Sequence, residues 1–561
     1  MSSLWNYFVG YASLSGLILL VFENSDWAAK NYAWFAFTGR CLIGLALVDA
    51  AARLLACTDR RAHLRNYWPD SIVFAPVVAY IIFQEDCYCV TVLARQAALL
   101  RIMLTRFREA HKPLPLWTLH PAQTVVFGFL MLITAGTTIL MLPEACATGQ
   151  KTAGVDALFT ATSAVCVTGL TVVDTAQYFS RFGQTVLLAL IQLGGFGIMT
   201  AAVGLVVMLR KEINVRQQVA LQDALDHDSL AGARQLMRFI VAMTLTLEAA
   251  GTVLLWVTWG RQLGWSATTA YHALFHSVSA FCNAGFSTFA ASLAAFRNDL
   301  ATNIIICILI ILGGLGFMSV RDIVENLKPS SAARTHQPVR LRVHTKLVLT
   351  VSLVLIAAGA LILYAMEREA SFAGWDFKTK ILASLFQSIS ARTAGFNTCD
   401  IGRLAPASLF VLTVLMFIGA SPGGTGGGIK TTTVAVLWAV VVSRLRGREN
   451  VELCKRTLPV ETILKAVSLL FISLCLVIVF GAALMYTENH SPLALLFETV
   501  SAFGTVGLSV GITPHMTTAG KLLITILMLV GRLGPLTLAY AVILRRTPAK
   551  YVLAEERVMI G

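Results

Sequence analysis

Residues 386–396 read FQSISARTAGF, and the same pattern, Phe with Ser four residues later and Gly a few residues beyond, occurs in three further segments. The three are FTATSAVCVTGL at residues 159–170, FHSVSAFCNAGF at 275–286 and FETVSAFGTVGL at 497–508. The four phenylalanines are spaced by 116, 111 and 111 residues. A pattern that recurs at a nearly constant spacing indicates several copies of one structural unit. The chain is therefore predicted to contain four such units.

Each of the four segments lies between two long apolar stretches, and its two halves differ in composition. The first half is apolar but too short to cross a bilayer, and the second half carries Gly, Thr, Asn and Ser where a spanning helix would carry Leu. This composition is typical of a re-entrant unit, in which a short pore helix is followed by extended backbone. Irregular backbone at membrane depth is stable only where it lines a cavity or is buried in protein. The four segments therefore predict one pore surrounded by four re-entrant loops.

Composition places the chain in a membrane. Hydrophobic residues make up 57% of the 561 residues and charged residues only 13%, unlike a soluble chain of this length. The apolar residues are grouped in runs of about 20, the length that crosses a bilayer. Examples are residues 125–142, 185–209, 239–257, 303–320 and 347–366. We therefore predict an all-α integral membrane protein with four tandem repeats of membrane helix, pore helix and membrane helix around one pore.

The positive charge of the chain is concentrated in a few short loops. The net charge is +14, and basic residues cluster after each expected second membrane helix. Examples are Arg210 and Lys211, Arg340 and Arg342, Arg444 and Arg446, and Arg545 and Arg546. Alternate loops carry few basic residues, and this asymmetry places the basic loops in the cytoplasm. The distribution argues against nucleic acid as the reason for the positive charge.

The second halves of the four segments are the predicted site of ion binding. Backbone carbonyls that point inward from extended strands can replace the hydration shell of a cation. Glycine lets the backbone approach the ion, and the carboxyl ends of pore helices favour a cation on the axis. No acidic ring is needed, and Glu498 is the only acidic residue in the four segments. The predicted selectivity-filter residues are Val167, Thr168, Gly169 and Leu170; Asn283, Ala284, Gly285 and Phe286; Thr393, Ala394, Gly395 and Phe396; and Thr505, Val506, Gly507 and Leu508.

Several longer motifs make the family of the chain recognisable. They are RTAGFNT at residues 392–398, GASPGGTGGGIKTTT at 419–433, GRLGPLT at 531–537, and Gly-Gly-x-Gly runs at 194–197 and 313–316. With these motifs, residues 121–561 resemble the pore subunit of the bacterial Trk/Ktr potassium transporters, a superfamily that includes the plant HKT proteins. Within it, the Ktr-type membrane subunit is the more similar one.

The resemblance implies potassium uptake through a filter of four re-entrant loops. Serine at the first filter glycine accompanies sodium permeation in plant relatives, so Gly169 favours potassium. In the third segment Gly395 follows its Phe by nine residues instead of ten, and the family's RTAGF motif shares this shortening.

The resemblance also implies partners. It implies a homodimer in membrane lipid and a cytosolic ring of nucleotide-binding regulatory subunits of the RCK type. No nucleotide-binding loop is recognisable in the chain, so no cofactor is expected on it, and ATP or ADP is expected on that partner. The resemblance implies K+ as the transported ion, and Na+ is a candidate activator.

An apolar stretch at residues 408–441 is interrupted by Pro422 and by the five glycines that follow it, Gly423, Gly424, Gly426, Gly427 and Gly428. A proline and three consecutive glycines cannot hold a straight helix. The break is either a flexible kink without a role or a loop that obstructs the pore, and the resemblance favours the loop.

Arg532 lies within the apolar residues 522–542, and a charge at that depth needs water or a partner. The family places this arginine beside the loop, where we expect it to form a barrier against wrong ions and to steady the loop. Lys430 is either part of the gate or one of the basic residues that flank a membrane helix on the cytoplasmic side. The predicted gate residues are Gly423, Gly424, Thr425, Gly426, Gly427, Gly428, Lys430 and Arg532.

These observations divide the chain into five parts. The first is a bundle of about four membrane helices, and four pore repeats follow. The boundaries are 1–120 for the bundle, and 121–215, 216–330, 331–450 and 451–561 for the repeats, with the gate loop at 419–433. The last helix of the bundle carries Arg95, Arg101 and Arg106, as a voltage sensor would. Ala98 and Leu104 interrupt the spacing of a sensor, so a bundle that only packs or stabilises a dimer is the alternative.

Three function classes fit a membrane chain with internal repeats. The first is a potassium uptake protein of the plasma membrane, the inner membrane of a bacterium. The second is a sodium or mixed-cation transporter, or a coupled cation symporter, on the same fold. Coupled transporters typically have inverted repeats, whereas these repeats run in one orientation. The third is a membrane enzyme, which the isolated positions of Glu248 and Glu498 argue against.

Overall fold

The computed structural model describes residues 121–196, 230–327, 341–454 and 456–542. The predicted N-terminal bundle, residues 1–120, lies outside these ranges, as do the basic loop around Arg210 and the residues after 542. The described part is helical, apart from a short hairpin of β1 (Glu452–Leu453) and β2 (Arg456–Thr457). The all-α prediction is confirmed for these residues.

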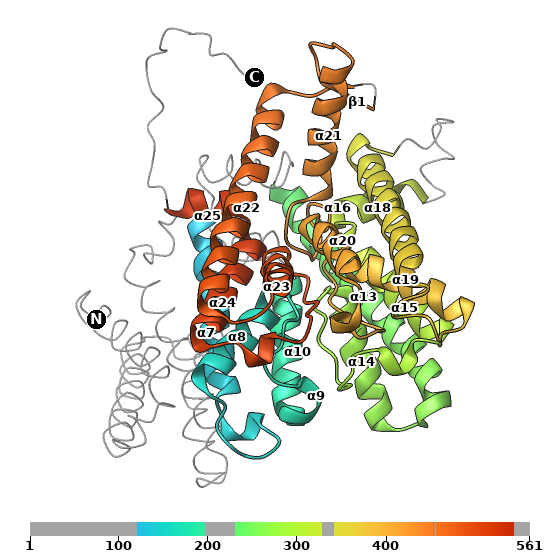
Figure 1. The fold of residues 1–561 in the computed structure, drawn as a ribbon, viewed down its shortest axis with the longest axis vertical. Coiled ribbons are helices and arrows are strands. Elements are labelled where there is room, and N and C mark those ends of the chain that lie inside the picture. Colours follow the sequence, from blue (N-terminus) through green and yellow to red (C-terminus); the bar gives the residue numbers. More distant parts are fainter. Residues whose placement is uncertain (1–120, 197–229, 328–340, 455, 543–561) are drawn as a thin grey trace, which may run out of the picture.

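The helices follow one another in the same order four times (Figure 1). We call the four groups units 1 to 4, each with a long first helix, a short helix, an extended segment and a second helix. The first helices are α7 (Pro121–Leu140), α13 (Leu230–Leu263), α18 (Val343–Glu367) and α22 (Val460–Thr487). The short helices are α8 (Gly154–Val165), α14 (Ala267–Phe281), α19 (Phe377–Ser390) and α23 (Pro492–Gly504). The second helices are α10 (Arg181–Gly195), α15 (Leu300–Gly314), α20 (Pro406–Phe417) and α24 (Thr518–Leu533).

Further elements continue or connect the second helices. Three helices follow them: α16 (Phe317–Leu327) after α15, α21 (Thr431–Leu445) after α20, and α25 (Pro535–Val542) after α24. Single turns lie in the connections: η3 (Pro143–Ala145), α9 (Thr175–Tyr178), η4 (Ala294–Phe296), η5 (Ile401–Arg403) and η6 (Thr513–His515). Figure 1 shows α21 and α22 running together to the end of the molecule where β1 joins them, opposite the end that holds α9.

Among the described residues, three first helices are long and apolar enough to cross a membrane: Met237–Leu263 within α13, α18 and α22. Their outward faces carry large apolar side chains, and Leu353 and Leu361 on α18 and Phe471 on α22 are each 69% exposed. Apolar surface on this scale is unfavourable in water and is covered by lipid tails in a bilayer. The chain is a multi-pass membrane protein.

The short helices form the core of the described part. Each motif phenylalanine on them is fully buried: Phe159, Phe275, Phe386 and Phe497. Each short helix packs against the first helix of its own unit and the second helix of the unit before it. The contacts between units are α10 with α14, α15 with α19, α20 with α23, and α24 with α8. Because the last contact joins unit 4 to unit 1, the units close into a ring.

The second helices are 12 to 16 residues long, shorter than a membrane span, and glycines lie at the ends of three of them, α10, α15 and α24. The end of α15 is Gly314, and the chain turns by 102° into α16 at Gly316, whose φ is +87°. The apolar run at 303–320 is therefore divided between two helices, because a residue at positive φ cannot continue a helix, and α15 and α16 have the length and apolarity of a span only as a bent pair. The predicted interruption after α20 is present, but α21 begins at Thr431, so the loop is shorter than 419–433.

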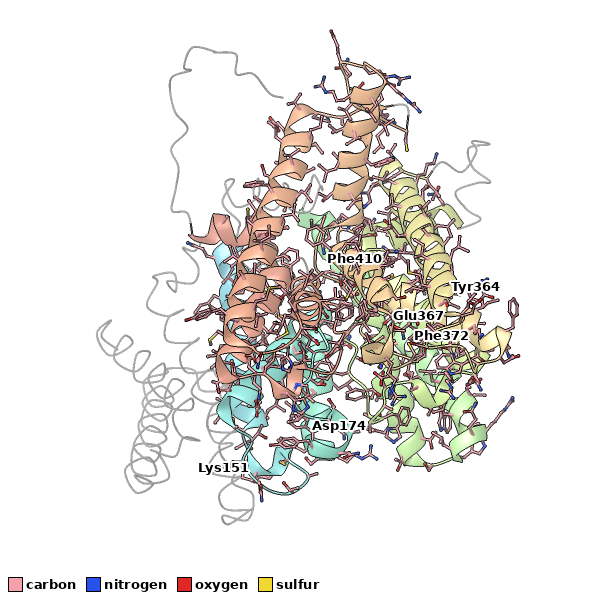
Figure 2. All side chains as sticks on the ribbon, in the orientation of Figure 1. Lys151, Asp174, Tyr364, Glu367, Phe372 and Phe410 are labelled. Carbon is pink, nitrogen blue, oxygen red and sulfur yellow. The ribbon has the colours of Figure 1, made fainter. Side chains whose placement is uncertain are left out.

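Buried carboxylates fix the start of two second helices. Glu367, at the end of α18 beside Phe372 (Figure 2), accepts hydrogen bonds from the backbone N–H groups of Ser371 at 3.2 Å and Ala405 at 2.9 Å. Glu488 accepts one from Thr517 N–H at 3.0 Å in the same way. Ala405 and Thr517 directly precede α20 and α24, and a negative charge is favourable at a helix N-terminus. Each carboxylate thus ties a first helix to the second helix of its unit.

Candidate functional site

The four extended segments that follow the short helices meet in a ring. Each predicted filter glycine faces the backbone of the neighbouring unit so closely that an added Cβ atom would lie within 3 Å of a carbonyl oxygen. The pairs are Gly169 with Ala284 O (2.4 Å), Gly285 with Ala394 O (2.8 Å), Gly395 with Val506 O (2.5 Å) and Gly507 with Thr168 O (2.1 Å). The φ angles of these glycines, +91°, +68°, +79° and +87°, also favour glycine. Any side chain at these positions would push the ring apart.

The residue two places before each of these glycines has an unusual backbone. Val167, Asn283, Thr393 and Thr505 are fully buried and have φ angles of 55°, 59°, 78° and 50°. The left-handed conformation costs roughly 1–2 kcal/mol for a residue with a Cβ atom. Such backbone persists only where its surroundings hold it, and it is concentrated at functional sites. The ring is therefore held by packing rather than by the intrinsic preference of its residues.

The motif serines attach each extended segment to its short helix. In units 1 and 4, Ser163 and Ser501 accept hydrogen bonds through Oγ from Gly169 N–H and Gly507 N–H, both at 3.1 Å. In units 2 and 3, Ser279 and Ser390 donate from Oγ to backbone carbonyls, those of Phe286 at 2.8 Å and Phe396 at 2.5 Å. The constant distance of these serines from Phe is visible in the sequence, but their hydrogen-bond partners are not.

The structure brings all sixteen predicted filter residues together at the ring. Four of them supply the carbonyls that the glycines face, namely Thr168, Ala284, Ala394 and Val506. Four others bury their side chains in the core and anchor the segments: Leu170, Phe286, Phe396 and Leu508. The shorter spacing in unit 3 is absorbed at the helix end. There Ala394 N–H bonds to the carbonyl of Ser390, four residues back, whereas Thr168 N–H bonds to that of Ser163, five residues back.

Glu498 on α23 holds the segment that leaves the ring in unit 4. Its fully buried carboxylate accepts hydrogen bonds from Ser509 Oγ at 2.5 Å, from Val510 N–H at 3.1 Å and from Thr513 Oγ1 at 3.0 Å. These partners are two hydroxyls and one backbone amide from the segment that follows the pattern, and none is acidic or a histidine. The carboxylate is a structural part of the candidate site.

The loop between α20 and α21, residues 418–430, lies against the ring. It is closed at its base by a hydrogen bond from Gly419 N–H to Ile429 O at 2.9 Å. Gly427 N–H donates to Thr505 Oγ1 at 2.9 Å. Gly426 packs on Thr393, since an added Cβ atom would lie 2.1 Å from Thr393 Oγ1. The loop thus contacts Thr393 and Thr505, two of the four residues with left-handed backbone that lie two positions before a ring glycine.

Arg532 and Lys430 hold the loop through its carbonyls. Arg532, buried on α24, donates from one guanidinium nitrogen to Thr425 O and from the other to Gly194 O at 2.5 Å. Lys430 Nζ donates to Gly426 O at 2.5 Å. One arginine of unit 4 therefore bridges the loop of unit 3 and the end of the second helix of unit 1. The predicted gate residues lie together, and Gly428 also packs against Gly504 at the end of α23.

Comparison with protein families gives a match over most of the chain. The model of the TrkH family, described as cation transport protein, matches residues 95–550. The chain belongs to the TrkH family. The family is one of transporters and not of enzymes, and the resemblance to the Trk/Ktr superfamily is confirmed.

Two individual relatives show which members of the TrkH family this chain is similar to. Ktr system potassium uptake protein B of Bacillus subtilis is 38% identical over 423 residues, 75% of this chain and 92% of the relative. Potassium/sodium uptake protein NtpJ of Enterococcus hirae is 35% identical over 450 residues, 79% of this chain and 98% of the relative. The similarity to the Ktr-type membrane subunit is confirmed.

A solved structure shows that the TrkH-family fold extends over most of the chain. The crystal structure of the potassium transporter TrkH from Vibrio parahaemolyticus aligns with a TM-score of 0.63 and covers 87% of this chain and 98% of that chain. At 19% sequence identity, this likeness concerns the fold alone.

Proposed function

We propose that this chain takes up potassium across the bacterial inner membrane through one pore, with four tandem repeats around it and the ring as selectivity filter. The observation that carries the proposal is the ring itself, in which four glycines face four backbone carbonyls of neighbouring units. Backbone carbonyl oxygens that surround a narrow pore can replace the water around a cation. The names of two relatives, one a potassium and the other a potassium/sodium uptake protein, support this class of ion.

The same proposal assigns the loop at residues 418–430 as the gate of the pore. The loop packs on Thr393 and Thr505, so it lies directly beside the ring. Arg532 keeps it there through Thr425 O and adds a positive charge that repels cations. Opening requires that the loop leave these partners, after which ions pass the ring.

In this proposal, partner subunits regulate the opening of the pore. The chain functions as a homodimer in lipid and docks on a cytosolic ring of RCK-type subunits that bind ATP or ADP, with Na+ as an activator. The described basic residues at the end of α21, Arg444, Arg446 and Arg448, supply a docking charge next to the hairpin of β1 and β2. Binding of the regulatory subunit should fall when these three are replaced by glutamine. Unchanged binding would remove the docking role.

Uptake of radioactive rubidium into proteoliposomes that contain this chain and are loaded with potassium tests the proposed function. We expect uptake that excess external potassium blocks and excess sodium does not. A total absence of uptake, both alone and with a regulatory subunit, would contradict the proposal.

A sodium or mixed-cation transporter on the same fold is the second candidate. It is favoured by one observation, the name of NtpJ as a potassium/sodium uptake protein at 35% identity. In the rubidium assay, equal competition by sodium and potassium would select this candidate.

A further inference from the structure

The junction of α15 and α16 in unit 2 is a sharp bend, which we call the elbow and define as residues 313–317. The two helices meet at 102°, and Gly316 at the bend has a φ of +87°. A Cβ atom added to Gly316 would lie 2.3 Å from the carbonyl oxygen of Pro422 in the loop of unit 3. The elbow therefore lies in direct contact with the loop at the one residue whose conformation makes the bend.

The elbow and the loop share three backbone hydrogen bonds. Two run from the loop to the elbow, from Ser421 N–H to Gly314 O at 3.0 Å and from Thr425 N–H to Gly313 O at 3.2 Å. The third runs the other way, from Phe317 N–H to Gly423 O at 3.0 Å. Because a glycine-rich loop has little conformational preference of its own, these bonds contribute to its position together with the bonds to Arg532, Lys430 and Thr505.

Asp322 fixes the other end of this connection. It is 8% exposed, and its carboxylate accepts hydrogen bonds from the backbone N–H of Arg342 at 3.0 Å and from Asn326 Nδ2 at 3.2 Å. Arg342 is the residue directly before α18, a first helix long enough to cross the membrane. A carboxylate at the start of a helix also interacts favourably with the helix dipole. Asp322 thus anchors α16 to a helix that the bilayer holds.

Apolar contacts make α16 a rigid link between the anchor and the elbow. Val320 of α16 packs with Leu315 of the elbow and with Val348 of α18 in one buried cluster. Figure 1 shows α16 beside α18. The connection therefore runs without interruption from α18 through Asp322 and α16 to the loop.

We propose that the elbow holds the gate loop in its obstructing position, with Gly316 and Asp322 as positioning residues. This inference rests on the proposed function, in which the loop is the gate. Neither residue belongs to the filter or to the predicted gate. Their loss should free the loop without changing the ring that selects the ion.

The test is rubidium uptake by proteoliposomes that contain the full chain alone, without a regulatory subunit. We expect Asp322→Ala to raise uptake by roughly tenfold, because it removes hydrogen bonds to a charged group that hold the closed position. Gly316→Ala should also raise uptake, because its Cβ atom displaces Pro422. Discrimination of potassium from sodium should stay as in the wild type for both. Asp322→Asn keeps an acceptor for Arg342 N–H and should restore most of the closed state.

The control is Glu325→Ala, which removes an acid from the same helix. Glu325 is half exposed and pairs with Arg321 on α16 at 2.7 Å, and it should have wild-type uptake when replaced. Should Asp322→Ala fail to assemble, Gly316→Ala alone tests the expected rise in uptake. Wild-type or reduced uptake by the assembled Asp322→Ala and Gly316→Ala variants would overturn the inference.

Arg532→Gln separates this inference from the proposed function. If Arg532→Gln raises uptake and the elbow variants do not, the loop is still the gate and the elbow is not its support. If none of the three changes uptake, the loop is not the gate, and the elbow inference fails with that assignment, whereas the proposal of potassium uptake through the ring is judged by the uptake of the wild type.

Discussion

Four serines at one fixed position show how a small polar side chain holds a strained backbone. Two of them accept hydrogen bonds from the ring glycines, and two donate to the carbonyl that follows the glycine. A buried N–H group without a partner costs about 1–3 kcal/mol. In units 1 and 4 the serine hydroxyl therefore removes this cost at the ring glycine.

Ser501→Ala should lower the discrimination of potassium from sodium. The change leaves Gly507 N–H without its acceptor and lets the segment of unit 4 relax. The measurement is competition by both ions for rubidium uptake. The matched control is Ser473→Ala on α22, a buried serine whose hydroxyl has no hydrogen-bond partner among the residues that the structure describes. Discrimination at the wild-type level in Ser501→Ala would show that the ring keeps its shape without this contact.

Gly507→Ala should abolish selective uptake. The new Cβ atom would lie 2.1 Å from Thr168 O, and a carbonyl of the ring would have to move. Gly511→Ala is the control, because Gly511 has a φ of +94° but nothing within 4 Å of an added Cβ atom. It should lose about 1–2 kcal/mol of stability through its backbone alone and keep selectivity. Equal loss of selectivity in both variants would mean that strain, not the contact across the ring, is responsible.

At the scale of helices, the contacts between units are where side chains close the ring. Lys521 on α24 pairs with Asp156 on α8 at 2.7 Å, joining unit 4 to unit 1. Arg181 at the start of α10 lies 4.5 Å from the ring centroid of Tyr271 on α14, joining unit 1 to unit 2. Arg297 lies 4.8 Å from the ring centroid of Trp375, joining unit 2 to unit 3. Basic side chains near the second helices thus hold three of the four junctions.

The pair of Lys521 and Asp156 should contribute a measurable coupling energy to stability. Both side chains are mostly buried, at 15% and 24% exposed, so their attraction is less screened than at a surface. A double-mutant cycle with Lys521→Ala and Asp156→Ala in thermal unfolding should give about 0.5–1 kcal/mol. The exposed pair of Arg403 and Asp400, 83% and 63% exposed, should give a coupling energy near zero. The prediction is wrong if the two cycles give the same value.

Most of the ring could be predicted from the sequence, but the contacts of the loop and the elbow could not. Phe, Ser and Gly of each segment lie within 12 residues, so a pattern along the chain captures them. The loop was expected because Pro422 and its glycines cannot form a helix. Its contacts with Gly313 and Thr505 join residues more than 70 positions apart, and no local pattern encodes them. The elbow was missed because the apolar run continues through it, and only the positive φ of Gly316 reveals the bend.

At the scale of the whole molecule, the loop of unit 3 connects all four units. It bonds to the elbow of unit 2 and to Thr505 of unit 4, and Arg532 links it to Gly194 of unit 1. A movement of any unit relative to the others must therefore change the contacts of the loop. The loop is therefore the described segment at which movements of all four units would be felt together.

Arg532→Gln should raise rubidium uptake in the absence of a regulatory subunit. Glutamine cannot reach both Thr425 O and Gly194 O, so the loop loses its link to unit 1, and a positive charge leaves the pathway. The control is Arg392→Gln, a buried arginine that donates to Ser352 Oγ at 3.1 Å and lies outside the loop. Reduced uptake by Arg532→Gln would show that the charge attracts or orients other groups instead of closing the pathway.

The closure of unit 4 onto unit 1 has a consequence for symmetry. A ring made from four identical subunits would carry every feature four times, and four buried guanidinium groups would lie beside it. Their mutual repulsion in a medium of low dielectric constant would be severe, and four copies of the loop would compete for one space. Because the four units here are joined in one chain, each can make contacts of its own, and among the described residues Arg532 of unit 4 meets the loop of unit 3 beside the ring. The chain thus combines a ring of nearly equal backbone with asymmetric contacts around it.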